Sequence, residues 1–513
     1  MSQTANRVIK NTGYLYAKMA ITMFVSLYTT RLILNSLGAS DFGIYNIVGG
    51  AIAMLGFLNS AMASATQRFM SYSAGEGNKN NQKVIFNVSI VMHLGIALFF
   101  VFLLLIAGLF FFNGILNIPT ERVFAAKVVY GSLIFSTALT VINVPYDAIM
   151  NAHENMRYYA FVGIIESFLK LLVAYICIWY AGDKLIAYGI LMSLIPVITL
   201  TIMKIYCHKN YEECCFSLHR CWDQRTFKSM LSFASWNLFS IAAAMITNSG
   251  VGIVMNNFFG TIVNAAQGIA NQICGQLLSI TNAMSKAVNP VITKAEGAKD
   301  HVKVIKMASS SSKAYFYLIS FIAIPAIITM PELLRIWLKN VPEFAIFFAQ
   351  CQLVIALCEQ LTNGFNSAIT ASGNIKGVSL VKSIFKISYL PISYLLFKVG
   401  YNPIVAYSIL VIIQGVINGI AIPVIFSNKI FNCHIKIFLK EIFLPVMLSC
   451  FCVCVLDYSL TIYIDGFLRL VVIFPLSIII YTICYYLLVL NNGEKEILNV
   501  MLQKAKSCIN NDK

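Results

Sequence analysis

Fourteen mainly apolar stretches, each long enough to cross a lipid bilayer, constrain this 513-residue sequence more than any other feature. A transmembrane helix needs about 20 consecutive apolar residues. The stretches lie at 12–37, 43–71, 83–112, 122–147, 158–181, 184–206, 229–258, 261–289, 303–330, 342–371, 376–399, 403–427, 436–457 and 466–490. Only 11% of the residues are charged, whereas a soluble protein carries about 25%. The chain is therefore predicted to be an all-α polytopic membrane protein, which excludes a soluble enzyme or a nucleic-acid-binding domain as a description of the whole.

Basic residues alternate between the two sides of the predicted membrane. With the N-terminus in the cytoplasm, the cytoplasmic segments and helix ends hold 27 of the 37 Lys and Arg residues, and the opposite side holds 7. Lys382 and Lys386, near the start of the eleventh stretch, belong to the cytoplasmic group. This excess follows the positive-inside rule. Both termini are therefore predicted to be cytoplasmic, and the net charge of +16 is interpreted as an orientation signal rather than as a nucleic-acid-binding surface.

The sequence repeats itself at a nearly constant offset. A shift of 222 residues aligns Gly38 with Gly260, and a shift of 220 aligns Asn143 with Asn363. We expect two parallel six-helix lobes related by a pseudo-twofold axis along the membrane normal, as in transporters that rock two such lobes. A gene duplication without transport is the alternative. The predicted parts are lobes 1–206 and 229–427, a cytoplasmic linker 207–228, two further helices in 428–490 and a cytoplasmic tail 491–513.

Three basic residues remain inside the predicted spans, where charge is costly and usually faces a cavity or a partner. Lys18 and Arg31 lie in the first span and are candidates for binding a diphosphate, since arginine pairs well with phosphate oxygens. Snorkelling to the membrane surface is the alternative. Lys170 lies four residues after Glu166, a spacing that favours a neutralised helix pair. Glu166 and Glu359 are the candidates for binding a coupling ion.

Amide and hydroxyl side chains recur at helical spacing in four of the spans. Such groups both donate and accept hydrogen bonds, which suits sugar hydroxyls as well as water. The alternative is hydrogen bonding between helices. The candidate cavity residues are Asn264, Gln267, Asn271, Asn282 and Asn289 in the eighth span, Asn363 and Asn366 in the tenth, and Ser60, Ser64 and Gln67 in the second. A shorter set in the seventh span comprises Asn237, Ser240 and Thr247.

The sequence contains no phosphate-binding loop of the nucleotide-hydrolase type, no HExxH and no Cys/His cluster. We therefore expect neither catalysis nor a metal or organic cofactor. The fourteen cysteines mostly lie singly in apolar runs and are interpreted as small packing residues. No cleavable signal peptide is expected at the polar N-terminus.

Two stretches of sequence resemble the polysaccharide flippases of the Wzx type, which belong to the same superfamily as the MATE multidrug exporters. The first is RLILNSLGASDFGIYNIV, which starts at Arg31 and is similar to the junction between the first two helices of that family. The second is PYDAIMNAHENM from Pro145, followed by ESFLK from Glu166, and it looks like the region of helices four and five. The fourteen-helix count agrees with the resemblance over the whole chain.

The resemblance implies a MATE-like fold and a flippase function. Such proteins move undecaprenyl-diphosphate-linked oligosaccharide from the cytoplasmic to the periplasmic leaflet of the bacterial inner membrane, for surface polysaccharide and lipopolysaccharide (O-antigen) biosynthesis. The family's cavities are cationic, which matches Lys18 and Arg31. Coupling to a proton or sodium gradient, and contact with a polysaccharide polymerase and glycosyltransferases, are further expectations. The expected partners are thus the lipid-linked oligosaccharide and membrane lipids, with no nucleic acid.

Three alternatives remain open at this point. A MATE-type cation-coupled drug antiporter should place acidic residues in the central helices, and spans one, two, seven and eight contain none. A flippase for lipid-linked peptidoglycan precursor also has fourteen helices and a cationic cavity, but resembles this chain less between Gly38 and Tyr45. A non-transport scaffold of a polysaccharide assembly complex is the third alternative.

Overall fold

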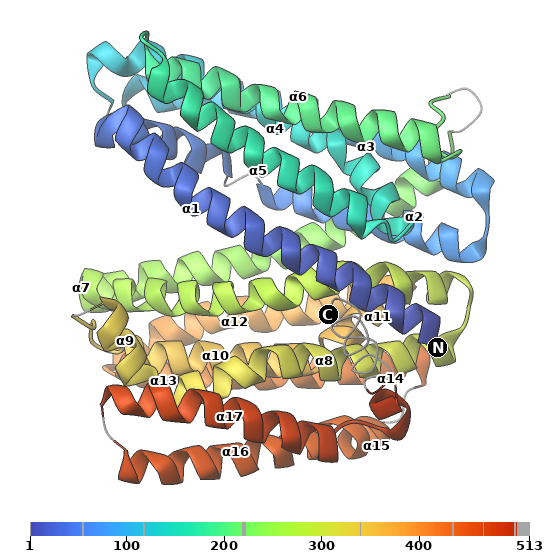
Figure 1. Cartoon of the computed structure of the whole chain (residues 1–513), viewed down its shortest axis with the longest axis vertical. Coiled ribbons are helices and arrows are strands. Elements are labelled where there is room, and N and C mark those ends of the chain that lie inside the picture. The colour runs from blue at the N-terminus through green and yellow to red at the C-terminus, as the bar shows by residue number, and fades with distance from the viewer. Residues whose placement is uncertain are drawn as a thin grey trace, which may run out of the picture. The chain divides into compact units, whose positions relative to one another are not determined.

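The computed structural model in Figure 1 describes residues 2–496 and 499, apart from 54–55, 116–117, 218–221, 339, 433–434 and 465. Within these described residues the chain forms helices joined by short connections, without a strand. The predicted all-α fold is therefore confirmed. Most of the predicted tail 491–513 lies outside the described residues.

The first half of the chain contains seven long helices. They are α1 (Ser2–Ala53), α2 (Gly56–Glu76), α3 (Lys79–Phe110), α4 (Val123–Ala152), α5 (Met156–Trp179), α6 (Lys184–Asn210) and α7 (Gln224–Gly297). The connection between α6 and α7 covers residues 211–223, which is shorter than the predicted linker 207–228 because both helices extend into it.

The second half begins with α8 (His301–Ile328) and a short amphipathic helix, α9 (Met330–Leu338). The following helices are α10 (Ala345–Leu361), α11 (Asn363–Ser372), α12 (Lys376–Val399), α13 (Pro403–Leu410), the π-helical η3 (Val411–Ala421), α14 (Ile422–Phe431), α15 (Ile435–Phe438), the π-helical η4 (Leu439–Phe443), α16 (Leu444–Tyr463) and α17 (Phe467–Leu488).

Eleven helices of the described residues are long and apolar enough to cross a membrane, or twelve if the bent pair α10 and α11 forms one span. The number is lower than the predicted fourteen because two helices run through a kink. The 74 residues of α7 would extend about 110 Å at 1.5 Å per residue, far more than a bilayer core of about 30 Å. Dividing α7 at Gly260, and counting 39–76 after Gly38 as a span, gives fourteen.

The two kinks have the same backbone conformation. Gly38 has φ 78° and ψ 166°, and Gly260 has φ 79° and ψ −172°. This region of φ and ψ is essentially restricted to glycine, because a Cβ would be strained against the backbone of the adjacent residues. The pair aligned by the 222-residue shift therefore occupies equivalent positions in the fold.

The residues that follow α2 and α7 also share a backbone conformation with each other. Gly77 and Lys299, also 222 residues apart, have positive φ angles of 71° and 58°. The next residues, Asn78 and Asp300, cap the N-termini of α3 and α8 by accepting the amide N–H three residues further on. The repeat thus extends through the second helix of each half.

The chain divides into two compact units. The N-terminal unit is Ile9–Leu238, and the C-terminal unit is Met1–Val8 with Phe239–Lys513. The boundary lies within α7, and the predicted division into lobes 1–206 and 229–427 stays a prediction.

In the N-terminal unit, α4 packs against α2, α3 and α6. Val129 and Tyr130 are buried where these helices meet, and the Tyr130 hydroxyl donates to the carbonyl of Leu104 at 2.6 Å. Gly189 of α6 allows the close approach, since a Cβ there would lie 2.9 Å from the Val129 side chain. Small residues at such contacts bring helices together where apolar burial alone cannot.

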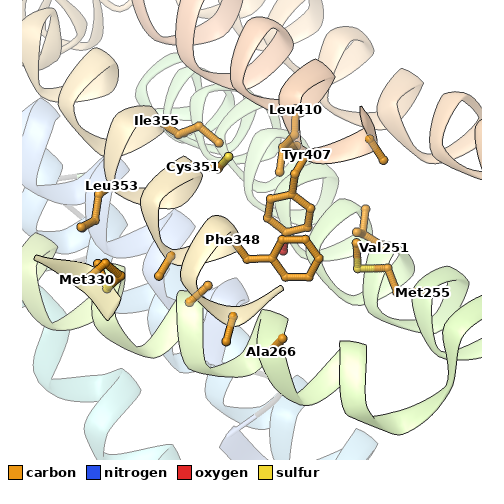
Figure 2. Close-up of a cluster of buried hydrophobic side chains, with 14 of the residues drawn as sticks. Val251, Met255, Ala266, Met330, Phe348, Cys351, Leu353, Ile355, Tyr407 and Leu410 are labelled. Atoms are coloured by element: carbon orange, nitrogen blue, oxygen red, sulfur yellow. The ribbon is translucent and has the colours of Figure 1, made fainter. Parts of the chain in front are cut away.

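The core of the C-terminal unit is apolar and aromatic. Figure 2 shows the rings of Phe348 and Tyr407 lying face to face, with their centroids 3.8 Å apart and their planes 10° apart. Val251 and Met255 of the first half of α7 are buried in the same cluster. This packing joins α7, α10 and α13.

The last two helices, α16 and α17, lie side by side and pack against α8 (Figure 1). The Tyr485 hydroxyl donates to the Lys313 carbonyl at 2.5 Å, and the Lys313 ammonium lies 3.2 Å from the Glu494 carboxylate. Ser320 donates to the Tyr481 hydroxyl at 2.5 Å. The predicted two-helix extension is thus an integral part of the C-terminal unit.

Candidate functional site

Arg31 is exposed on α1, as a residue that binds a ligand must be. One turn earlier on the same helix, the Tyr28 hydroxyl lies 3.1 Å from the Tyr175 hydroxyl of α5. This contact ties the Arg31 segment to α5 while the arginine itself remains at the surface. Its predicted role in diphosphate binding is compatible with this position and stays a prediction.

Lys18 packs against α5. Its ammonium lies 4.3 Å from the centroid of the Tyr159 ring, a cation–π contact. A Cβ at Gly163 would lie 2.1 Å from the Lys18 Cε, so the lysine stem occupies the space that the glycine leaves. The contacts attach α1 to α5, and they give Lys18 a structural role beside the predicted diphosphate role, which stays untested.

Glu166 and Lys170 form the predicted pair within α5. The Lys170 ammonium donates to the Glu166 carboxylate at 2.7 Å, and each side chain is 42% exposed. The carboxylate therefore has a cationic partner on its own helix. The alternative role of Glu166 in binding a coupling ion stays a prediction.

The candidate polar residues of α2 share one face of the helix by their spacing, but they differ in exposure. Ser60 is exposed and donates to the carbonyl of Gly56 at 3.1 Å, whereas Ser64 and Gln67 are half-buried. In the seventh predicted span, the Asn237 amide donates to the carbonyl of Ala61 at 3.4 Å. That contact is the hydrogen bonding between helices that the sequence left open as the alternative to a cavity.

The predicted amide stripe of the second half of α7 separates into two groups. Asn264, Asn271 and Asn282 are exposed. Gln267 is 6% exposed and its amide lies 3.5 Å from the carbonyl of Asn248, while Asn289 is half-buried. The exposed group forms a polar face, and the other group packs against neighbouring helices.

A hydrogen-bonded polar network joins the end of α7 to the break between α10 and α11. The Asn363 amide donates to the Gln360 side chain at 2.9 Å and to the Ser285 hydroxyl at 3.4 Å. The Ser367 hydroxyl donates to the Asn289 side chain at 2.8 Å. Asn289 and Asn363 are thus brought together with Ser285, which belongs to the same predicted stripe as Asn289, and with Gln360 and Ser367, which the sequence pattern did not single out.

The helix break at this network is built into the packing. α10 and α11 meet at Thr362 with a bend of 50°. The Thr362 hydroxyl donates to the carbonyl of Gly419 in η3, and the Ser312 hydroxyl of α8 accepts the Gly364 amide at 3.0 Å. A Cβ at Gly364 would lie 2.1 Å from the carbonyl oxygen of Ala308. The Gly364 amide N–H at the bend therefore finds its partner on another helix.

Charged groups lie at the edge of the same network. The Lys382 ammonium of α12 donates to the Asn366 side chain at 2.7 Å. Burial and repulsion from Lys386 disfavour the charge on this ammonium, whereas attraction from Glu359 favours it. The positive-inside rule assigned Lys382 and Lys386 to the cytoplasmic side. Their distance from the start of the span is the signal that could have identified them as candidate substrate-binding residues.

A second ionic cluster, in the N-terminal unit, was not predicted as one. Arg122, just before α4, donates through Nε to Asp41 at 2.9 Å and through one terminal nitrogen to Asp183 at 2.7 Å. Asp41 is buried three residues after Gly38, and Asp183 caps α6. The cluster ties the segment after the kink to the beginnings of α4 and α6, so its role is structural.

Solved structures that are similar to this chain include MATE transporters and a MOP superfamily transporter. A MATE in the bent conformation has 14% identity, with 84% of this chain and 96% of that chain covered and a TM-score of 0.72. A Vibrio cholerae MATE transporter in the bent form has 17% identity, 84% and 98% coverage and a TM-score of 0.68. A MOP superfamily transporter from Pyrococcus furiosus, described as having a binding pocket of reverse polarity, has 14% identity, 85% and 97% coverage and a TM-score of 0.68.

No protein-family model matches the sequence, and neither does any curated protein. The identities to the solved structures are low, so the likeness shows the fold alone. The chain is a multi-pass membrane protein with the fold of MATE transporters, as predicted.

Proposed function

We propose that the chain is a flippase that moves undecaprenyl-diphosphate-linked oligosaccharide from the cytoplasmic to the periplasmic leaflet of the bacterial inner membrane by alternating access. The single observation that carries the proposal is the exposed polar face of α7. Asn264, Asn271 and Asn282 lie within a span, and all three are exposed.

An exposed polar face in a membrane span is explained by contact with water or with a polar substrate. The exposed face of α3 shows the contrast, because it presents residues such as Leu98, Phe102 and Leu105. Amides that faced lipid would leave their hydrogen-bonding groups unsatisfied, at a cost of roughly several kcal/mol per group. A face built from asparagines therefore supports a hydrated path, and its donors and acceptors suit the hydroxyls of a sugar chain.

The charge of the candidate residues favours an anionic substrate. Arg31 is exposed on α1, and Lys382 and Lys386 lie within the α12 span. A diphosphate carries negative charge that lysine and arginine neutralise, and arginine binds it with paired hydrogen bonds. Acidic residues in the first two spans and in α7, which a cationic drug would require, are confined to Asp41, Glu76 and the last turn of α7 at Glu296.

A cation-coupled drug antiporter is the second candidate, and the fold is equally consistent with it. The MATE structures to which the chain is similar include a multidrug resistance transporter. Glu359, half-buried beside the polar network, offers a carboxylate that could bind the coupling cation. Loss of a flippase would leave lipid-linked oligosaccharide in the cytoplasmic leaflet, whereas loss of a drug antiporter would leave the drug inside the cell.

Deleting the gene in its own bacterium and restoring it with variants distinguishes the two. Arg31→Ala should lower the surface display of lipid-linked glycan about tenfold or more, because one charged hydrogen-bond partner of the diphosphate is lost. Arg31→Lys should retain part of the activity, and Arg335→Ala, which removes an exposed arginine of α9, should behave as the unchanged protein. All variants are compared at equal amounts in the membrane.

The deletion strain supplies the decisive outcomes. Intact surface polysaccharide together with increased drug sensitivity would replace the flippase by the antiporter. Normal glycan display by the Arg31→Ala variant would remove Arg31 from the substrate site without affecting the function.

A further inference from the structure

The two lysines of α12 lie deeper in their span than basic residues that only set the orientation of a helix in the membrane. Lys382 and Lys386 follow the first residue of the helix by six and ten residues, which is roughly 9 and 15 Å along the axis. Half of a bilayer's hydrocarbon core is about 15 Å thick. Cationic groups at that depth normally mark a partner or a ligand pathway.

The Lys382 side chain is held by the protein instead of extending to the helix start. Its ammonium donates to the Asn366 side chain of α11 at 2.7 Å. An ammonium has three N–H donors, and Asn366 takes one of them. Asn366 lies one turn after Asn363 and next to Ser367, both of which are fixed by the network with α7. The position of the cation is therefore predetermined by the fold.

The charges of this cluster do not balance. Lys382 and Lys386 are one helical turn apart and repel each other, whereas Glu359 attracts Lys382. By formal charge, the two lysines and Glu359 sum to +1. A ligand with two negative charges on closely spaced oxygens would relieve the repulsion and use the remaining donors.

We infer that Lys382 and Lys386 form a binding site for a phosphate-class anion within the C-terminal unit, in which Asn366 positions the Lys382 ammonium and Glu359 weakens anion binding. The inference rests on the proposed function for the identity of the ligand, which is then the diphosphate of the lipid-linked substrate. The neutral amides and hydroxyls of the adjoining network would contact uncharged parts of the same molecule.

Binding of farnesyl diphosphate, a short lipid-linked diphosphate, tests the site on the full-length protein in nanodiscs of phosphatidylcholine. Lys382→Gln and Lys386→Gln should each raise the Kd about tenfold or more at low salt, because each removes a charged donor. Glu359→Gln should lower the Kd, since it removes the competing negative charge. Lys398→Gln, at the other end of α12, is the matched control and should leave the Kd unchanged.

Two further arms define the ligand and guard against misfolding. Competition by inorganic pyrophosphate would show that the diphosphate alone is recognised. Farnesyl diphosphate binding that resists pyrophosphate would assign the site to lipid-linked diphosphates. Both results support the proposed anion site. Lys382→Arg keeps the charge and should bind within a few-fold of the unchanged protein. If Lys382→Gln does not fold, Lys386→Gln decides.

Two results would overturn the inference. One is binding that is unchanged in both glutamine variants, and the other is an equal loss in Lys398→Gln, which would mean non-specific attraction. The proposed function fails separately, if the deletion strain displays normal surface glycan while farnesyl diphosphate binding still depends on Lys382. Conversely, a glycan-negative deletion strain with lysine-independent binding removes the site and keeps the function.

Discussion

Single glycines determine where the longest helices of this protein bend. Gly38 and Gly260 have φ near 80° and ψ near 180°, and no atom beyond the adjacent residues and the helix's own backbone lies within 4 Å of where a Cβ would be. Their requirement for glycine is therefore a matter of backbone conformation and not of space. The sequence aligned the two residues, but the alignment did not reveal the conformation that they share.

Replacing either glycine should strain the backbone. Gly38→Ala and Gly260→Ala should each lower the free energy of unfolding by about 1–3 kcal/mol, the cost of holding a residue with a Cβ in this region. The fall in Tm is measured by intrinsic fluorescence on heating the detergent-solubilised protein. Gly43→Ala is the control, because Gly43 lies in regular helix with open space around it. A Gly38→Ala variant as stable as the control would disprove the strain.

The candidate site was partly predictable at this scale. Asn289, Asn363 and Asn366 were identified by their helical spacing, because polar residues recurring on one face of an apolar helix are visible in a sequence. Ser285 recurs in the same stripe, but Gln360 and Ser367 were not identified, since their hydrogen bonds depend on the neighbouring side chains and helices. Lys382 was assigned to orientation because the positive-inside rule counts every basic residue near a helix end alike.

At the scale of whole elements, one arginine connects three helices of the N-terminal unit. Arg122 binds Asp41 after the kink of α1 and Asp183 at the start of α6. In the sequence these residues are three loop charges separated by 61 and 81 positions. Their convergence depends on the tertiary arrangement, so spacing along the chain could not predict it.

Arg122→Gln should destabilise the N-terminal unit. It leaves the buried Asp41 carboxylate without its charged partner, which should cost about 1–3 kcal/mol and lower the Tm. Arg122→Lys should recover part of the loss, because lysine restores the charge but cannot bridge both carboxylates with a planar fork. Lys127→Gln, an exposed change one turn into α4, is the comparison. Equal Tm values for Arg122→Gln and Lys127→Gln would contradict a structural role for the cluster.

The break between α10 and α11 was not predicted by the pattern of apolar residues. The sequence predicted one span over 342–371, and the structure bends it by 50° at Thr362, which is not a proline. The repeat-related helix α4 contains Pro145 and remains one continuous helix. The difference lies in the partners: the Ser312 hydroxyl of α8 accepts the Gly364 amide at the break, and a carbonyl of η3 accepts the Thr362 hydroxyl. Such tertiary compensation leaves no mark on an apolar pattern.

At the scale of the whole molecule, the sequence predicted the all-α membrane fold because hydropathy is summed over many residues in each span. The orientation taken from loop charge and the division into two six-helix lobes stay predictions. The packing of α16 and α17 against α8 was not predicted, since it depends on particular contacts such as Tyr485 with Lys313. The substrate also remains a proposal, because a fold shared at 14% identity specifies helices and not ligands.

The exposed face of α7 gives the last prediction, which tests whether a hydrated path exists at all. In a variant without the fourteen native cysteines, single cysteines at 264, 271 and 282 should react with a charged, water-soluble thiol reagent, because a thiol reacts as the thiolate and needs water around it. Leu98→Cys and Phe102→Cys, also exposed on α3, should react with the charged reagent only after the protein is denatured, because a thiol that faces lipid is not ionised.

The comparison separates a water-filled path from simple exposure to lipid, because all five positions are exposed and differ in the polarity of their native residues. If transport alternates between two states, the rate of labelling at Asn271→Cys from one side of the membrane should also change when substrate is added. Equal, slow labelling at the α7 and α3 positions would mean that the amide face is turned towards lipid. The observation that carries the transport proposal would then be lost, although the fold would stand.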